Sequence, residues 1–392
     1  MSEVFVIDAL RTPFGSFGGS LSTVPAPQLA ATVVAELIKR HGLDPATIDQ
    51  FIAGQVITGG CGQAPARQAM RATGIPDAVP ALTINKVCGS GLKAIMLAAD
   101  AIRLGDDQLA IAGGMENMSL APYALPAARY GMRLGNGQAI DLMIHDALLD
   151  PYSGRHMGEV TEVAIAEQQI SREDQDAYAI SSYQRAQAAQ QSGFHAREIV
   201  PVVKSGRKGD VTIAEDEEPT KTDFAKFTGL RPVFKKDGTL TAGNASTIND
   251  GAAFAIIASA AAVKQFGLKP QARLVAYATN SMHPDQFPVA PVGAIERVCA
   301  KAGLSIADID LFEINEAFSA VALMAINNLG LNRDKVNIHG GAVSIGHPVG
   351  ASGGRLVATL LNGLKETGGR YGLATLCIGG GEAVAAIFEN LA

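Results

Sequence analysis

The sequence feature that most limits the fold is an internal repeat. Three pairs of short segments recur in the same order: His41–Asp49 with Ala302–Asp310 at an offset of 261 residues, Cys88–Gly91 with Gly350–Gly353 at 262, and Ala112–Glu116 with Ile378–Glu382 at 266. Ordered matches at a nearly constant offset indicate that one structural unit is present twice. We therefore expect two equivalent halves, whose matching turns meet near a pseudo-twofold axis and build one central site.

The span between the repeats sets the predicted domain boundaries. Residues 119–248 have no partner in the repeat, so we expect them to form an inserted loop domain that covers or binds something. The N-terminal half is then residues 1–118 together with 249–268, and the C-terminal half is residues 269–392. Within the insertion, residues 204–236 lose hydrophobic periodicity and fill with charged residues, Gly and Thr, which predicts a long loop, mobile or functional.

The halves themselves are predicted to be of the α/β class, because strand and helix patterns alternate. Short apolar, β-branched runs predict strands at residues 4–9, 109–112, 254–258, 274–278, 309–314, 373–378 and 384–388. Helices are expected after Pro27 up to Gly42, from Gly91 to Leu104, and from a Ser171 cap to Gly193.

Composition excludes several classes of protein. With 47% hydrophobic and 18% charged residues, the chain is not of the disordered class. Its formal net charge of −6 argues against a nucleic-acid binder that relies on a general positive field. No apolar run approaches the ~20 residues of a membrane span, and the N-terminus MSEVFVIDAL is unlike a signal peptide. The four cysteines lack CxxC spacing, so we expect free thiols and a cytoplasmic location.

Cys88 lies where a strand-like stretch ends and an amphipathic helix begins, in the segment NKVCGSGLKA. The unpaired N–H groups at a helix N-terminus favour a thiolate over a thiol, and the neighbouring glycines leave the sulfur accessible. Cys88 is therefore a candidate nucleophile. The alternative is a small buried cysteine in a glycine-rich turn.

His347 lies in a second glycine-rich turn, GGAVSIGHPVGASGG, again just before a helical pattern. It precedes the repeat equivalent of Cys88 by three residues, so the pseudo-twofold axis brings the two side chains together. A cysteine and a histidine paired in this way activate a nucleophile. The alternative is a histidine that only hydrogen-bonds the loop.

Two further segments end in chemically useful residues. Cys377 closes an apolar strand in CIGGGE, where Cys377 could exchange a proton with a substrate carbon and the N–H of Gly379 could stabilise an oxyanion. Asn315 ends another strand in EINEAF, where its amide could hold a water or a substrate oxygen without adding charge. For both segments the alternative is an ordinary turn at a strand end.

Other chemistry has little support. The chain has no GxxxxGK[ST] motif and no complete GxGxxG followed by an acidic residue, and its histidines and cysteines lack metal-ligand spacing. We expect no catalytic metal and no permanently bound cofactor.

Taken together, NKVCGSGLKA, NEAF, GGAVSIGHPVGASGGR and CIGGGEA resemble the thiolases in order and separation, and so do KFTGLRPVF at residues 226–234 and TAGNASTINDG at residues 241–251. The resemblance covers essentially the whole chain. It implies the thiolase fold: duplicated α/β halves, layered α/β/α/β/α, with an inserted loop domain that binds coenzyme A. It also implies a homodimer or a homotetramer.

The resemblance assigns a role to each candidate. Cys88 would take the acyl group as a thioester, His347 would activate it, and Cys377 would remove the α-proton of the second acyl-CoA. Asn315, through a water, and His347 would contact one thioester oxygen. The backbone N–H groups of Cys88 and Gly379 would form a second oxyanion hole.

Coenzyme A thioesters are the substrates that the resemblance implies. The residues expected to contact coenzyme A are His156, Met157, Phe234, Ser246, Ala317 and Phe318. Lys221, with Lys204, Arg207 and Lys208 as further basic candidates, could approach phosphate; the alternative is a solvated loop face interleaved with residues 215–218. Two departures from the family pattern stand out. Glu382-Ala383 follows the three glycines where a further glycine is expected after one residue, and Thr220-Lys221 stands where an arginine is often found.

The predicted activity is that of an acetyl-CoA C-acetyltransferase, which makes or cleaves acetoacetyl-CoA. A 3-ketoacyl-CoA thiolase of broader chain length is the alternative within the class, since Phe287 could line or narrow the acyl pocket. A cysteine-dependent acyl-CoA hydrolase and a non-catalytic acyl-CoA carrier are the alternatives from other classes; the hydrolase would need Cys88 and His347 but not Cys377.

Overall fold

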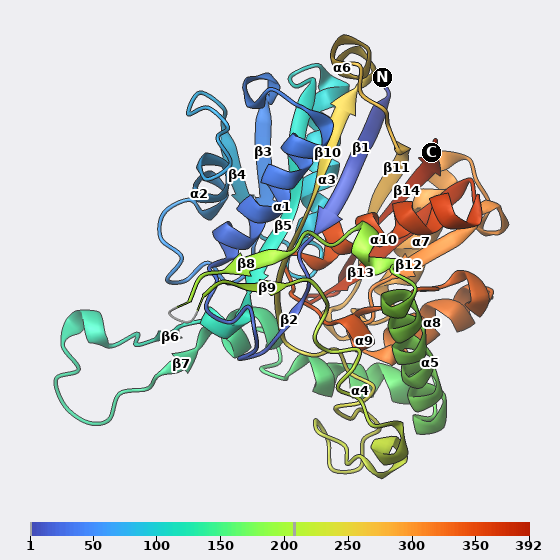
Figure 1. The fold of residues 1–392 in the computed structure, drawn as a ribbon. Helices are drawn as coiled ribbons and strands as arrows, with labels where there is room; N and C mark the ends of the chain where they lie inside the picture. Colours follow the sequence, from blue (N-terminus) through green and yellow to red (C-terminus); the bar gives the residue numbers. More distant parts are fainter. Residues whose placement is uncertain (1, 207–208) are drawn as a thin grey trace.

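The computed structural model describes residues 2–206 and 209–392. Its main element is a ten-stranded sheet in the order β12-β13-β14-β11-β1-β10-β5-β3-β4, with β2 paired to β10 (Figure 1). The strands are β1 (Val4–Arg11), β2 (Gly15–Ser16), β3 (Gln50–Gly54), β4 (Ala81–Ile84), β5 (Leu109–Asn117), β10 (Asn249–Ser259), β11 (Ala272–Ser281), β12 (Leu311–Ile314), β13 (Tyr371–Ile378) and β14 (Glu382–Asn390).

The helices pack in layers around this sheet. They are α1 (Ala26–His41), α2 (Pro65–Arg71), α3 (Ser90–Leu104), α4 (Met157–Glu167), α5 (Arg172–Gln191), α6 (Ala260–Phe266), α7 (Ala290–Ala302), α8 (Ser319–Leu329), α9 (Ala342–Ile345) and α10 (Ser352–Thr367). The apolar residues of α3 and α10 share one core with strands of both halves. Helices α1 and α2 cover the outer face of the N-terminal strands, and α7 and α8 cover that of the C-terminal strands. The five layers implied by the thiolase resemblance are confirmed.

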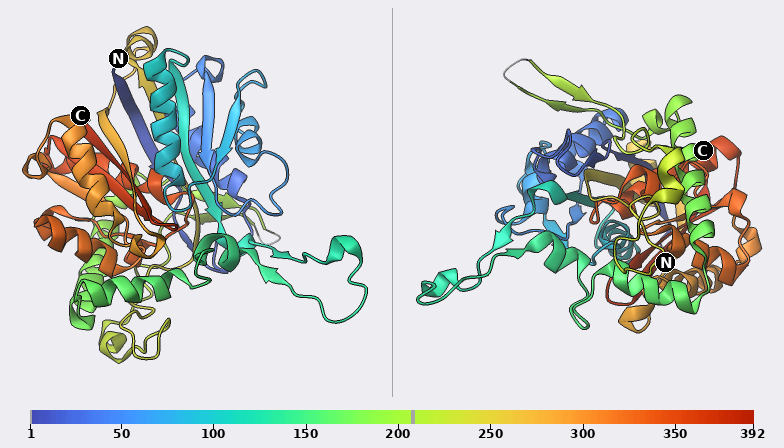
Figure 2. Two further views of the ribbon diagram at one scale, coloured as in Figure 1. Left: turned by 180° about the vertical axis from the view of Figure 1, so that it is seen from behind. Right: turned by 90° about the horizontal axis from the view of Figure 1, so that it is seen from below.

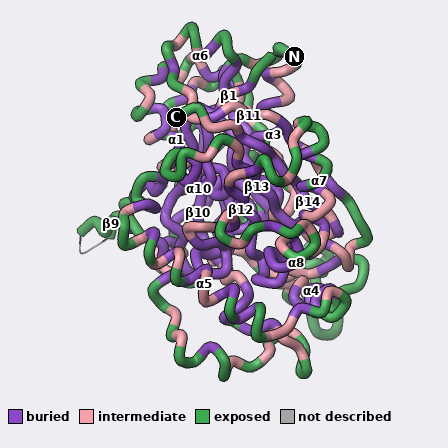
Figure 3. Tube along the Cα trace, turned by 90° about the vertical axis from the view of Figure 1, so that its right-hand side faces the viewer, coloured by how far each residue is buried: buried purple, intermediate pink, exposed green. Residues whose placement is uncertain are grey.

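Among the described residues, the strands of the two halves pair at one short contact. Strands β1 and β11 pair only at Phe5 with Arg273 and Val6 with Ala272, whereas β1 and β10 pair along nearly their whole length. The sheet is therefore continuous, yet its two ends face each other across α3 and α10. Buried residues concentrate on these central elements, and exposed residues lie on the peripheral loops (Figure 3).

The repeat seen in the sequence corresponds to repeated elements. Helices α1 and α7 both end at a glycine in the left-handed region, Gly42 at φ 57° and Gly303 at φ 69°, a conformation that glycine adopts without steric cost. Strand β3 then matches β12, α3 matches α10, and β5 matches β13. The positions of the domain boundaries remain a prediction.

Glycines allow the equivalent helices α3 and α10 to touch where they begin. A Cβ on Gly353 would lie 2.2 Å from the backbone nitrogen of Leu92, and one on Gly91 would lie 2.9 Å from the carbonyl oxygen of Gly350. Side chains at these positions would separate the helices. The turns that precede them, which carry Cys88 and His347, therefore meet at the centre of the molecule.

The segment between β5 and β10 contains α4, α5 and two small hairpins, β6 (Tyr123–Ala124) with β7 (Ile140–Asp141) and β8 (Val202–Lys204) with β9 (Val211–Ile213). The β6–β7 arm projects away from the body of the molecule (Figures 1 and 2). The predicted loop at 204–236 is therefore partly structured, because its threonine and valine residues pair in a strand too short to give a periodic pattern. No helix of the described residues is long and apolar enough to cross a membrane.

The three predicted helices are confirmed as α1, α3 and α5. The predicted cap of α5 is also confirmed, because the Ser171 side chain accepts the N–H of Asp174. The seven predicted strands are also present, although most are longer than expected. Strands β2, β3 and β4 of the main sheet were not predicted.

Candidate active site

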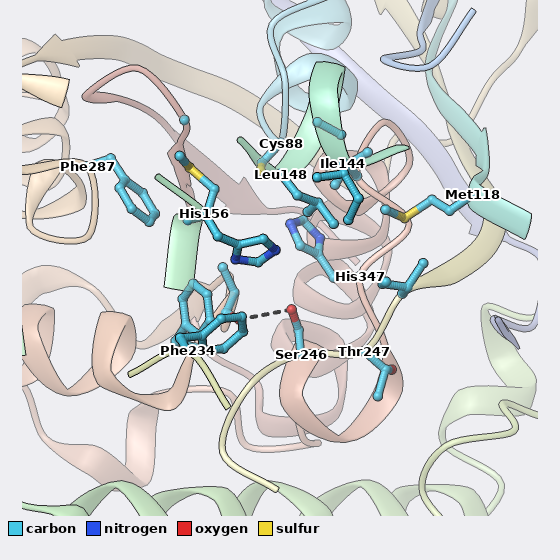
Figure 4. A pocket seen from close by; sticks show the side chains of 17 residues that line it. Cys88, Met118, Ile144, Leu148, His156, Phe234, Ser246, Thr247, Phe287 and His347 are labelled. Atoms are coloured by element: carbon cyan, nitrogen blue, oxygen red, sulfur yellow. Dashed lines mark hydrogen bonds between the residues drawn. The ribbon is translucent and has the colours of Figure 1, made fainter. Parts of the chain in front are cut away.

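Three turns and part of the inserted segment enclose an apolar cavity of about 220 Å³ (Figure 4). The residues that line it are Cys88, Met118, Ile144, Ala147, Leu148, His156, Met157, Phe234, Ser246, Thr247, Ile248, Phe287, Ala317, Phe318, His347, Val349 and Gly379. Residues from both halves and from the insertion thus share one site. No three His, Cys, Asp or Glu side chains in the described part of the chain are grouped so as to hold a metal ion.

Cys88 is presented by a strained turn, residues 85–91, which we call the Cys88 turn. Val87, just before the cysteine, has φ 45°, a costly conformation for a β-branched residue. The turn is held internally, because Asn85 Oδ1 accepts the N–H of Val87 at 2.9 Å and Ser90 Oγ donates to the Val87 carbonyl at 2.7 Å. The Ser90 hydroxyl also accepts the N–H of Lys86 at 2.8 Å.

The Cys88 sulfur faces two backbone N–H groups, its own and that of Gly379, and both lower the pKa of its thiol. Burial has the larger, opposite effect and raises the pKa to about 11. The expectation that the helix N-terminus favours a thiolate was therefore wrong for the resting site. Helix α3 begins at Ser90, after the cysteine, and the apolar cavity penalises the charged sulfur more than the N–H groups stabilise it.

His347 is buried in the equivalent turn, residues 347–353, which we call the His347 turn. Its Nδ1 lies 2.6 Å from Ser352 Oγ, and this hydroxyl donates to the carbonyl of Pro348 at 3.0 Å. Because the hydroxyl proton is used on Pro348, Ser352 accepts the Nδ1–H, and Nε2 of His347 carries the lone pair that can accept a proton. Burial, followed by the charge of Arg355, lowers the pKa of His347 to about 3, so the ring is a neutral acceptor.

The backbone around His347 is fixed by Asn249. Asn249 Oδ1 accepts the N–H of His347 at 2.9 Å. The preceding residue, Gly346, has φ 109°, and a Cβ there would lie 2.4 Å from Asn249 Cγ. Only glycine allows this approach, which explains the glycine before the histidine.

Asn315 follows β12 and reaches the same histidine. Its Nδ2 lies 3.4 Å from His347 Nε2, while its Oδ1 is buried and makes no hydrogen bond within the described protein. The structure thus brings Asn315 and His347 together, with an acceptor left to hold a water or a substrate group.

Cys377 is 1% exposed near the end of β13 and does not line the cavity. Burial, and then the nearby Cys88, raise the pKa of its thiol well above the ordinary value. Both cysteines are therefore neutral thiols at neutral pH. A thiol in this state can donate a proton before it can accept one.

Six of the residues expected to contact coenzyme A line the cavity: His156, Met157, Phe234, Ser246, Ala317 and Phe318. The rings of His156 and Phe234 stack with centroids 4.8 Å apart, and Phe318 packs edge-on against Phe234. Ser246 Oγ donates to the Ala317 carbonyl at 2.9 Å. These contacts make one apolar wall with a polar edge.

The basic residues predicted near phosphate are not part of this wall. Lys221 does not line the cavity, because its ammonium group bonds Ser16 Oγ and lies 4.0 Å from Glu218. Lys204 donates to the carbonyl of Ser20 instead. Arg207 and Lys208 lie outside the described residues.

Sequence reasoning missed several lining residues: Met118, Ile144, Ala147, Leu148, Thr247, Ile248 and Val349. Most belong to the inserted segment or its edges, and nothing in the sequence marked Met118, Ile144, Ala147 or Leu148. Thr247 and Ile248 lie in the recognised segment 241–251, but neither was singled out. Ser352, however, lies in the recognised GASG motif and could have been found, since a hydroxyl five residues after a histidine at a helix start can reach its ring.

Comparisons with known proteins show the family of the chain. The family described as "Thiolase, N-terminal domain" matches residues 4–261, and "Thiolase, C-terminal domain" matches residues 268–390. Among similar proteins, an "Acetyl-CoA acetyltransferase" of Chromobacterium violaceum is 49% identical over 99% of this chain and 100% of that protein. A protein of the same name from Cupriavidus necator is 47% identical over the full length of both.

A solved structure gives the same result. The crystal structure of the Bacillus anthracis acetyl-CoA acetyltransferase superposes with a TM-score of 0.97 at 40% identity, covering 100% of this chain and 99% of that one.

Proposed function

Since the chain belongs to the thiolase family, we propose that it is an acetyl-CoA C-acetyltransferase that condenses two acetyl-CoA molecules to acetoacetyl-CoA and coenzyme A, and runs the reverse reaction. One observation carries the proposal: Cys88, a neutral His347 and the N–H of Gly379 face one apolar cavity.

The first step transfers an acetyl group to Cys88. His347 Nε2 takes the thiol proton while the sulfur attacks the thioester carbonyl. The carbonyl oxygen accepts hydrogen bonds from the N–H groups of Cys88 and Gly379. The bond to the coenzyme A sulfur then breaks. The leaving thiolate takes its proton from Cys377, whose thiol is protonated at rest.

This first step prepares the second. Cys377 is left as a thiolate and His347 as an imidazolium, with Ser352 accepting its Nδ1–H. The Cys377 thiolate removes an α-proton from the second acetyl-CoA, and the enolate oxygen is held by His347 Nε2–H and, through a water, by Asn315. The enolate carbon attacks the acetyl-enzyme. Cys88 leaves as a thiolate and takes the proton back from His347, which resets the site.

The short acyl chain is proposed from the residues around the cavity. The large side chains of Phe287, Met157 and Leu148 line the cavity and limit the space for an acyl chain. Phe287 is only 3% exposed. Phe287→Ala should raise turnover of a six-carbon 3-ketoacyl-CoA relative to acetoacetyl-CoA. An unchanged ratio would remove Phe287 as the determinant of chain length.

The activity itself is tested by the coenzyme A-dependent loss of acetoacetyl-CoA absorbance. We expect turnover by the wild type, little with a longer 3-ketoacyl-CoA, and none by Cys88→Ala. Strong turnover of the longer substrate would favour the broader 3-ketoacyl-CoA thiolase. Release of free acid without acyl transfer between thiols would favour a hydrolase.

We further propose a homotetramer in the cytoplasm. Support for assembly comes from the β6–β7 arm, on which the apolar side chains of Tyr130 and Leu134 are 81% and 100% exposed. Replacing residues 125–138 by a short polar linker should reduce the mass in solution to that of a dimer, measured by light scattering. An unchanged mass would contradict a role for the arm in assembly.

The cytoplasmic location is tested by cell fractionation, in which we expect the protein in the cytoplasmic fraction.

A further inference from the structure

An ion pair joins the Cys88 turn to the glycine turn of the other half. The ammonium group of Lys86 pairs with Glu382 Oε2. Lys86 stands two residues before Cys88, and Glu382 stands three residues after Gly379. The two partners are only 22% and 34% exposed, so solvent screens their attraction less than that of a fully exposed pair.

The carboxylate of Glu382 is held in place by contacts other than the one with Lys86. Glu382 begins β14, where it pairs with Ile378 in the ladder to β13. The Ser281 hydroxyl donates to Glu382 Oε1 at 3.2 Å and leaves Oε2 directed at Lys86. This glutamate therefore provides a fixed anchor on the C-terminal half.

The Cys88 turn needs an external anchor. The bonds made by Ser90 and by Asn85 Oδ1 stay within the turn, and Asn85 Nδ2 donates to the carbonyl of Val56 in the same half at 3.4 Å. These bonds therefore do not set the position of the turn relative to the other half. The apolar contacts across the boundary are close: a Cβ on Gly89 would lie 2.4 Å from Ile378 Cδ1. Such contacts limit the distance between the turns, but they lack the directionality of the charged hydrogen bond that the Lys86 ammonium group donates to Glu382.

The relative position of the two turns matters because each of them supplies one N–H group of the oxyanion hole. One N–H comes from Cys88 and the other from Gly379, and both face the same sulfur. Val87, in its strained conformation, lies between Lys86 and Cys88. A strained residue keeps its conformation only when its neighbours hold it there, and any relaxation would turn the Cys88 N–H away.

We propose that Lys86 and Glu382 are positioning residues that hold the N–H groups of Cys88 and Gly379 in register for acyl transfer. This inference rests on the proposed function and deepens it. It also gives a role to Glu382, which directly precedes Ala383, the position at which the sequence departs from the family pattern.

The test measures acetyl exchange between acetyl-CoA and isotopically labelled coenzyme A, which requires acyl transfer but no carbon–carbon bond. Lys86→Met and Glu382→Gln should each lower kcat for exchange about tenfold or more, with KM within about twofold, because the hole acts in the transition state. The double variant should be no slower than the slower single variant, since both changes remove one interaction. Lys86→Arg should recover most of the rate.

Glu389→Gln serves as the control, because it breaks the ion pairs with Arg273 and Arg370 on the far end of β14. It should leave exchange unchanged, and thermal unfolding should show all variants folded. Single variants with wild-type kcat, a change confined to KM, or additive effects in the double variant would overturn the positioning role alone. A wild type with no exchange would overturn the proposed function as well.

Discussion

The Cys88 turn and the His347 turn are built on the same plan but differ at the positions that do chemistry. Aligned by the repeat, NKVCGSG faces HPVGASG, so Asn85 corresponds to His347 and Cys88 corresponds to Gly350. The serine is common to both: Ser90 Oγ donates to the carbonyl of Val87, and Ser352 Oγ donates to that of Pro348.

The two turns also differ in how deeply they are buried and in what the opposite half places against them. The His347 turn is buried throughout, whereas the Cys88 turn is exposed or half-buried from Asn85 to Cys88 and buried only from Gly89 on. A glutamate of the opposite half meets each turn, but Glu382 meets the charged side chain of Lys86 while Glu116 Oε2 accepts the backbone N–H of Gly350 at 3.0 Å. The duplicated fold thus supplies two matching turns, and their different burial lets one receive a thioester while the other keeps an imidazole neutral.

The largest effect should come from the residue that distinguishes the Cys88 turn. Cys88→Ala should lower acetoacetyl-CoA turnover by more than about 10⁴-fold, because no other group in the cavity can carry the acetyl group. Cys61→Ala is the matched control, since Cys61 is a free, half-buried thiol that does not line the cavity. Substantial turnover by Cys88→Ala would remove it as the nucleophile.

The next effect concerns the protonation of the Cys88 thiol. Because burial raises its pKa from 9.0 to about 11, its thiolate fraction at pH 8 should be about a hundredfold below that of an ordinary cysteine. Alkylation of Cys88 by iodoacetamide, followed by mass spectrometry, should therefore accelerate about tenfold per pH unit from pH 7 to 10. A plateau below pH 8 would show a resting thiolate instead.

Replacing the equivalent serine in each turn should reduce turnover by different amounts. Ser352→Ala leaves the Nδ1–H of His347 without an acceptor and should reduce turnover by about 10–100-fold. Ser90→Ala removes hydrogen bonds only to backbone and should cost less than about tenfold. Equal losses of kcat in the two variants would contradict a specific role for Ser352 on the imidazole.

The smallest effect is on stability. Glu116 accepts the N–H groups of Val56, Ile57 and Gly350, so Glu116→Gln should leave one donor unsatisfied and lower the free energy of unfolding by about 1–3 kcal/mol.

This loss should depend on pH. Burial raises the pKa of Glu116 from 4.5 to about 7 in the folded state. The stability due to its bound proton is full below pH 4.5 and is lost as pH rises through 7. Thermal unfolding should therefore show a larger cost of Glu116→Gln at pH 5 than at pH 8; a larger cost at pH 8 would contradict the raised pKa.

The repeat predicted most of the fold because each match marks a feature that backbone geometry requires. Gly42 and Gly303 end equivalent helices, and Gly91 and Gly353 let α3 and α10 touch. The β8–β9 hairpin was missed because its few residues pair with each other rather than with a core, which leaves no hydrophobic pattern to read.

The candidate site was predictable to the same degree. Cys88 and His347 could be paired because the repeat relates their turns. The raised pKa of Cys88 could not be predicted, since it depends on how many apolar side chains surround the sulfur, and those come from distant segments such as Ile144 and Leu148. The roles of Lys86 and Glu382 were hidden for a similar reason, because their contact joins residues almost 300 positions apart.

The central claim is that the two cysteines divide the reaction, with Cys88 carrying the acetyl group and Cys377 moving the proton. The most direct measurement compares acetyl exchange and acetoacetyl-CoA turnover in Cys377→Ala. We predict that exchange falls by about a hundredfold or less, because the coenzyme A thiolate can leave without a proton donor, while turnover falls by more than about 10⁴-fold. Equal losses in the two assays, or wild-type turnover, would contradict this division.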